Sequence, residues 1–169
     1  SLNYKGNYGY SVARIKMPAT VVMPIGETSV DVDCEVLQDY TPMNRQILEF
    51  KATYADFHPA VVEQDIADDD MPVLTMTLSP TTVSEGAGPN AVIVKLRRDA
   101  EHAKGKVVIM IETLDDQQNP QPSTRLYTNK ESFTLQPGVI EAQFSLGVVD
   151  NDQKDGDAVV KVVARVYIR

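Results

Sequence analysis

Residues 68–86 read DDDMPVLTMTLSPTTVSEG, and this stretch decides the fold of the chain. It begins with three consecutive carboxylates, which repel one another and therefore need water or a cation around them. Pro72 then excludes a helix through the residues that follow. Beyond it the sequence alternates, with Leu74, Met76 and Leu78 on one side and threonines on the other. Such alternation is typical of a half-buried β-strand, so we expect an acidic junction followed by the first strand of a β-domain.

Composition bounds the class of protein. The chain has 169 residues and is 43% hydrophobic, which is enough for one or two domains with a real core. Aromatic residues make up 7% and tryptophan is absent, so the core must consist of Val, Ile, Leu and Met, as suits β-strands. The formal net charge is −8 and no basic stripe is present, which excludes nucleic acid as a partner. Divalent cations and basic proteins remain as partners.

The sequence does not by itself assign a compartment. Cys34 is the single cysteine and cannot form an internal disulfide, so cysteine usage is uninformative. No run of 18 apolar residues occurs, and we expect no membrane-spanning helix. The first residues, SLNYK, do not resemble a signal peptide and are typical of a mature or truncated start.

An internal repeat links the two halves of the chain. Residues 20–54 align without gaps on residues 132–166, an offset of 132 − 20 = 112. The matched apolar positions are Val30, Val32, Cys34 and Val36 with Ala142, Phe144, Leu146 and Val148, and Leu48, Phe50, Ala52 and Tyr54 with Val160, Val162, Ala164 and Val166. Each set has a period of two, which indicates the inward face of a strand.

The strand pattern predicts an all-β protein. We expect strands over residues 20–23, 28–37, 46–55, 60–66, 74–78, 90–98, 106–113, 131–135, 140–149 and 157–167, with a weaker pattern over 7–16. Sustained helical periodicity is absent from the sequence. Short strands at near-regular spacing favour immunoglobulin-like antiparallel β-sandwich modules in tandem. The predicted core residues are Val32, Cys34, Leu48 and Phe50 in the first half, and Leu74, Met76, Val83, Phe144, Leu146, Val148, Val160 and Val162 in the second.

Three segments carry a resemblance to a known family. They are the acidic junction with its first strand and TVSEG (82–86), QPG at 136–138, and VVDND at 148–152. These segments resemble Calx-β repeats, which are seven-stranded modules of sodium–calcium exchangers, integrin β4 and large bacterial surface proteins. The resemblance covers residues 18–169. It implies a partial unit over 1–70, holding the last four strands, and a unit over 71–169 that lacks its last strand.

The resemblance also implies where the missing strands come from. The economical interpretation is a fragment of a longer tandem array, and the alternative is that a neighbouring molecule supplies the strands. Because the first unit lacks early strands, residues 28–37 or 46–55 should present an unpaired edge or an apolar face. We expect residues 1–16, or a second molecule, to cover it in part.

Calcium is the cofactor that the resemblance implies, because exchanger-type repeats place carboxylates at one end of the sandwich. Carried onto this sequence, the candidate ligands are Asp68, Asp69, Asp70, Glu85, Asp115, Asp116, Asp150, Asp152, Asp155 and Asp157. Calcium takes six to eight oxygen ligands, and neither unit holds a complete set. We therefore expect weak affinity, on the order of 10⁻⁴–10⁻³ M. The alternative is that these carboxylates are solvated turn residues.

Other reactive side chains have structural explanations. Cys34 alternates with valines, so we expect it to point inward as a small hydrophobe. His58 and His102 lie in polar loops, and no Cys or His spacing supports a zinc site or a catalytic pair. We therefore expect both histidines at the surface.

These observations favour a non-enzymatic module that is extracellular or at the cell surface. We expect a structural or adhesion role in a large protein, with neighbouring β-sandwich modules of the same chain or other copies as partners. One alternative is a calcium-sensing module in which the ion sets the angle between units. Another is an accessory carbohydrate-binding or substrate-docking domain of a larger enzyme. Tyr4, Tyr8 and Tyr10 alternate as an aromatic sugar-binding strip would, and a simple edge strand or a disordered start is the alternative explanation for them.

Overall fold

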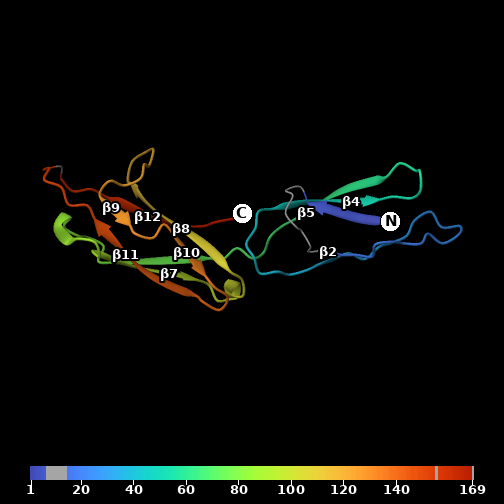
Figure 1. Ribbon diagram of the computed structural model, residues 1–169, viewed down its shortest axis with the longest axis horizontal. Coiled ribbons are helices and arrows are strands. Elements are labelled where there is room, and N and C mark those ends of the chain that lie inside the picture. Colours follow the sequence, from blue (N-terminus) through green and yellow to red (C-terminus); the bar gives the residue numbers. More distant parts are fainter. Residues whose placement is uncertain (7–14, 155, 169) are drawn as a thin grey trace. The chain divides into compact units, whose positions relative to one another are not determined.

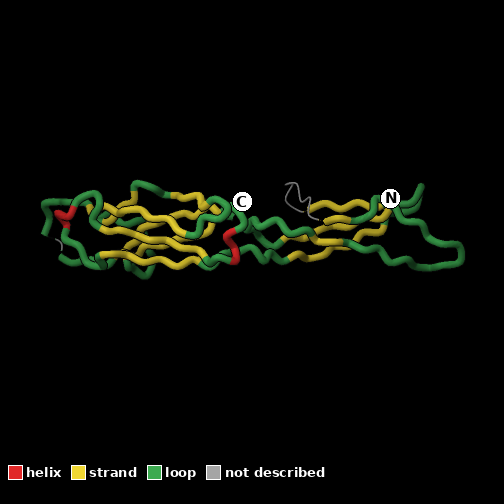
Figure 2. The backbone as a smooth tube through the Cα atoms, turned by 90° about the horizontal axis from the view of Figure 1, so that it is seen from below, coloured by secondary structure: helices red, strands yellow, loops and turns green. Residues whose placement is uncertain are grey.

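The computed structural model describes residues 1–6, 15–154 and 156–168. The chain forms two compact units. The first comprises residues 1–39 and 43–69, and the second comprises 40–42 and 70–169. The described residues are β-strands and loops, with two short 3₁₀ turns, η1 (Glu85–Ala87) and η2 (Glu101–Ala103) (Figures 1 and 2). The all-β class is thus confirmed.

The second unit consists of two antiparallel sheets. One sheet has the order β6-β7-β11-β9, with strands Leu74–Ser79, Val92–Arg98, Glu141–Val148 and Leu126–Thr128. The other has the order β10-β8-β12, with strands Ser132–Leu135, Val107–Asp115 and Val160–Val166. The predicted strands of this half are therefore present, and β9 is an additional short one.

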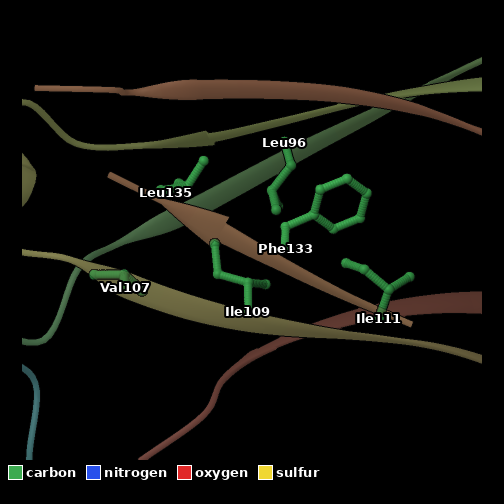
Figure 3. Close-up of a cluster of buried hydrophobic side chains, with 6 residues drawn as sticks. All are labelled: Leu96, Val107, Ile109, Ile111, Phe133 and Leu135. Carbon is green, nitrogen blue, oxygen red and sulfur yellow. The ribbon is translucent and has the colours of Figure 1, made fainter. Parts of the chain in front are cut away.

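Side chains from both sheets share one core. Leu96 of β7 lies in a cluster with five residues of the other sheet: Val107, Ile109, Ile111, Phe133 and Leu135 (Figure 3). Burial along β7 alternates strictly from buried to exposed over its seven residues. Alternation on both sides of a shared core means that the two sheets face each other in a sandwich-like arrangement.

The predicted core of the second half is largely confirmed. Leu146 is fully buried, in a second cluster with Val92, Val94 and Leu126. The other predicted residues are partly buried and pack against one or both clusters: Leu74, Met76, Val83, Phe144, Val148, Val160 and Val162. Leu74, Met76, Val160 and Val162 lie on the edge strands β6 and β12, and Val148 lies at the end of β11.

The first unit has much less core. Its main sheet has the order β1-β4-β5, with strands Leu2–Gly6, Gln46–Ala52 and Ala60–Ile66, and a two-residue ladder joins β2 (Ile15–Lys16) to β3 (Glu35–Val36). Among its described residues, only two hydrophobic side chains are buried, those of Ile15 and Leu48. A sheet with so little buried surface leaves one face open.

The β4 pairing of the first unit corresponds to a pairing of the second. Under the offset of 112, Ala52 of β4 corresponds to Ala164 of β12 (52 + 112 = 164). Ala52 pairs with Leu2 of β1, and Ala164 pairs with Ile111 of β8. Strand β1 therefore stands where the C-terminal half of β8 stands in the second unit.

The β3 pairing corresponds in the same way. Val36 corresponds to Val148 of β11 (36 + 112 = 148). Val36 pairs with Ile15, and Val148 pairs with Leu126 of β9. Strand β2 therefore stands where β9 stands. Residues 1–6 and 15–16 pair with β4 and β3, which confirms that the N-terminal residues cover part of the open edge.

The predicted strands over 20–23 and 28–37 are wrong in most of their length. Residues 20–34 are not strand, and only Glu35–Val36 of the second range is paired. The corresponding residues of β11 form a strand because β7 pairs with residues 141–146 along their length. Within the described part of the chain, no segment pairs with 29–34. The alternation was present, but the neighbouring strand it needs was not.

The prediction that Cys34 is buried is also wrong, since its side chain is exposed. Of the other core residues predicted for this half, Leu48 is buried, and Phe50 and Val32 are partly buried. Tyr8 and Tyr10 lie outside the described residues, as does most of the weak strand pattern over 7–16.

Candidate functional site

Arg98 is the most deeply buried charged residue described in the structure, with 1% of its surface exposed. It ends β7 and points into the second unit, where all five of its N–H donors face backbone carbonyl oxygens. Nε donates to Val139 at 2.8 Å. Nη1 donates to His102 at 3.1 Å and to Gly105 at 2.8 Å. Nη2 donates to Ala103 at 3.1 Å and to Gln136 at 2.7 Å.

These five bonds join two loops at one end of the second unit. The carbonyls of residues 102–105 lie in the β7–β8 connection, and those of residues 136 and 139 lie in the turn between β10 and β11. Burial lowers the pKa of Arg98, and the neighbouring Asp99 carboxylate raises it in part. Because a guanidinium has five N–H donors and no acceptor, none is left to bind a ligand. The Arg98 cluster is therefore structural.

Asp99 extends the same network to the start of β6. One carboxylate oxygen accepts the Val73 amide at 2.7 Å, and the other accepts the His102 amide at 3.2 Å and contacts Nδ1 of the His102 ring at 2.5 Å. Partial burial acts to raise the pKa of Asp99, but the bonds from His102 and Val73 outweigh it, so the pKa lies below its ordinary value. His102 is half-buried in this contact, which corrects its predicted surface position.

Sequence reasoning missed Arg98, although a signal was present. In VIVKLRR the buried positions are 92, 94, 96 and 98, so Arg98 falls in the apolar phase of its strand. A charged residue in that phase needs partners for every donor. The pattern alone could not indicate which loops supply them.

Most of the predicted calcium ligands lie at the opposite end of the second unit. We call this the acidic end; it comprises Glu85, Asp115, Asp116, Asp150, Asp152 and Asp157. Glu85 follows β6, Asp115 and Asp116 lie at the end of β8, Asp150 and Asp152 follow β11, and Asp157 precedes β12. The strand registers place these strand ends at the same end of the second unit. Asp155 lies outside the described residues.

Three side chains of the acidic end are engaged with other groups of the second unit. Glu85 accepts the backbone amide of Asn151 at 3.2 Å, which holds η1 against the loop after β11. Asp115 accepts the Gln121 amide at 2.8 Å, and Asp116 forms an ion pair with Lys161. Among the described residues, no three potential ligands at this end lie within 4.8 Å of one another. The acidic end is therefore not assembled as a cation site in this conformation.

The triplet Asp68-Asp69-Asp70 is the one group among the described residues whose ligand atoms all lie within 4.8 Å of one another. Asp68 accepts the Met43 backbone amide at 2.6 Å, and Asp70 is 7% exposed. Three carboxylate oxygens are suitable calcium ligands, but they provide fewer than the six to eight that the ion takes.

The triplet and Glu85 do not share a site. Val73 is held to Asp99 at one end of β6, whereas Glu85 follows the other end of that strand. The six residues of β6 span about 20 Å at roughly 3.3 Å per residue. Asp70 and Glu85 therefore lie at opposite ends of β6.

The first unit contains an apolar pocket of about 330 Å³. We define it by six of its lining residues, Leu2, Val32, Cys34, Phe50, Ala52 and Val62. The pocket lies against the β1-β4-β5 sheet, on the side of residues 32–34. Its lining holds no group of polar side chains that converge on one point. The pocket is therefore suited to bind apolar side chains rather than to hold a catalytic group.

Comparisons with protein-family models, with curated proteins and with solved structures found no match. None of the helical turns among the described residues is long and apolar enough to span a bilayer. The function must therefore be argued from the two units themselves.

Replacing Arg98 with Met should destabilise the second unit, because five buried or partly buried carbonyl oxygens lose their donor. We expect a loss of about 3–5 kcal/mol in the free energy of unfolding. Amide hydrogen exchange of β7 and β8 during urea titration measures this loss for the second unit. The matched control is Arg97→Met, one residue away on the exposed face, which should change stability by less than about 0.5 kcal/mol. Equal effects for the two variants would contradict the structural role.

Replacing Asp99 with Asn should remove an acid-sensitive part of the stability. The folded pKa of Asp99 lies below the ordinary 3.8, so its carboxylate stabilises the fold fully above pH 3.8. That contribution is lost as the pH falls through the lowered pKa. The stability gap between wild type and Asp99→Asn should thus shrink below pH 3.8. Urea titrations from about pH 6 to 2.5 measure it, with exposed Asp152→Asn as control. A constant gap would overturn the assignment.

Proposed function

We propose that this protein is a non-enzymatic structural or adhesion module of a large extracellular or cell-surface protein. Its units are immunoglobulin-like β-sandwich modules in series, and its partners are neighbouring modules of the same chain or other copies. The observation that carries the proposal is the correspondence of strand pairings between the units. Two successive segments with the same pairing scheme are typical of tandem arrays, whose modules act as spacers and display surfaces.

A second candidate function is calcium-dependent stiffening at the Asp68-Asp69-Asp70 triplet. The clustering of its three carboxylates favours this candidate. Without a cation, the like charges repel and oppose a fixed geometry. A bound ion would neutralise them, with backbone carbonyls and water completing its coordination.

A spacer module should resist force as one cooperative body. Single-molecule pulling on the full chain should show a discrete unfolding event for the second unit. Its residues 70–169 (169 − 70 + 1 = 100 residues) would add a contour of roughly 330–360 Å, less the end-to-end distance of the folded unit. The Arg98→Met variant should unfold at lower force, and Arg97→Met should not. Gradual extension without a discrete event would contradict a mechanical spacer role for this unit.

Millimolar calcium should raise the melting temperature if the triplet binds the ion. A hundredfold excess over Kd stabilises by about 2.7 kcal/mol, and weak affinity reduces this at accessible concentrations. Replacing Asp68, Asp69 and Asp70 together with Asn should abolish the rise. The control with equal charge loss is the triple Asn variant at Asp150, Asp152 and Asp157, which should retain it.

Calorimetry with calcium, magnesium or a chelator measures these melting temperatures. Loss of the rise in the control triple alone would move the ion to the acidic end. If calcium does not change the melting temperature of the wild type, the calcium proposal is wrong and only the structural role is retained.

A further inference from the structure

We propose that the apolar pocket of the first unit is a docking site for a β-hairpin of the same kind as β6–β7. The strand of the hairpin that enters the site carries apolar residues at alternate positions and basic residues between them. It pairs with residues 29–34 and inserts its apolar side chains into the pocket. This inference goes beyond the proposed function, since it requires neither calcium nor a mechanical role.

The pocket lining corresponds to the buried core of the second unit. Under the offset of 112, Val32 and Cys34 correspond to Phe144 and Leu146 of β11. Leu146 is fully buried, and Phe144 packs against both core clusters, whereas Cys34 is exposed. The position of Cys34 is thus open where that of Leu146 is covered, whereas Val32 and Phe144 are both partly buried.

The lining from the main sheet corresponds in the same way. Phe50 and Ala52 correspond to Val162 and Ala164 of β12 (50 + 112 = 162), and both of these pack against the core. Leu2 stands at the position of Ile111, as their pairings show, and Ile111 is 3% exposed. The pocket is therefore the inner surface of a sandwich whose second layer is incomplete.

Strand β7 is what covers the corresponding surface in the second unit. It pairs with β11 so that Val94 lies opposite Phe144 and Leu96 opposite Ala142. Val94 and Leu96 have no exposed surface. In the first unit the corresponding residues 29–34 have no strand partner within the described part of the chain. Their unpaired backbone and the open pocket lie together, which is the arrangement that strand addition exploits.

Charge on the exposed face specifies the chemistry of the partner. On that face, β11 places Glu141 opposite Arg97 and Gln143 opposite Lys95 of β7. In the first unit the exposed positions between the lining residues are Asp31 and Asp33. Opposite charges directly across a strand pair stabilise it, so the docking strand should carry Lys or Arg opposite these two aspartates. Under the offset of 112, Asp31 corresponds to Gln143, which lies opposite Lys95 of β7, whereas Asp33 corresponds to Ser145, which lies opposite Ile93.

A synthetic peptide of residues 72–98 tests the proposal with the full chain. Cys34 lies in the pocket and is the single cysteine, so its rate of reaction with a thiol reagent reports occupancy. We expect saturating peptide to slow the reaction at least about tenfold, because a thiol buried under a strand is inaccessible. Amide exchange at residues 29–34 should slow in parallel. A peptide carrying Leu96→Asp should protect neither.

A covalent graft tests the same contact when the free peptide does not fold into a hairpin. Because Leu2 stands at the position of Ile111, a copy of residues 71–109 followed directly by Ser1 keeps the register of the second unit. The graft should protect Cys34 and residues 29–34. A control graft of residues 71–110 shifts the register by one residue, which turns its apolar side chains to the opposite face, and it should protect neither.

Three results would overturn the proposal. The first is an unchanged Cys34 reaction rate with both the peptide and the in-register graft. The second is equal protection by the in-register and shifted grafts, which would indicate non-specific contact. The third is protection of Cys34 without peptide that rises with protein concentration, together with a dimer in sedimentation. That result would assign the pocket to a second copy of the chain.

Discussion

The buried guanidinium of Arg98 is the contact on which the second unit depends. A charge in a protein interior is stable only when its hydrogen-bonding groups are satisfied, and here five carbonyl oxygens satisfy five donors. Those oxygens belong to the two loops that close one end of the unit, and Asp99 ties the start of β6 to the same point. The sheets supply the area of the core, and Arg98 determines how their connections close at this end.

Sequence alternation predicted a strand correctly where the segment pairs with a neighbouring strand in its sheet and packs its apolar side chains against a second layer. The alternation of Leu74, Met76 and Leu78 and that of residues 141–148 both correspond to strands, because each has a hydrogen-bonded partner and a facing layer. Residues 28–34 show the same alternation and form no strand. A segment forms a strand when its residues favour the extended conformation and a neighbouring strand is present to pair with it. The alternation in a sequence reports the first condition and not the second. The exposed position of Cys34 follows from the same cause.

The candidate sites were harder to predict than the strands. The carboxylates of the acidic end were grouped only because the family resemblance implied that ligands gather at one end of the sandwich. Whether their oxygens converge depends on loop conformation, and Glu85 and Asp116 instead engage Asn151 and Lys161. The Asp68-Asp69-Asp70 triplet was placed correctly as a cluster because its members are consecutive. Its separation from Glu85 follows from the strand between them, which the sequence also predicted over residues 74–78.

Asp31 and Asp33 also bear on solubility. An unpaired strand edge beside apolar surface is a template for aggregation, and natural proteins protect such edges with charge. If two copies of this chain paired along residues 29–34, they would bring carboxylates against carboxylates, which is unfavourable. The same two residues that select a basic strand thus discourage identical chains from adding to one another. Residues 29–34 can stay unpaired in solution without aggregation, because their carboxylates favour a basic strand and repel a second copy of themselves.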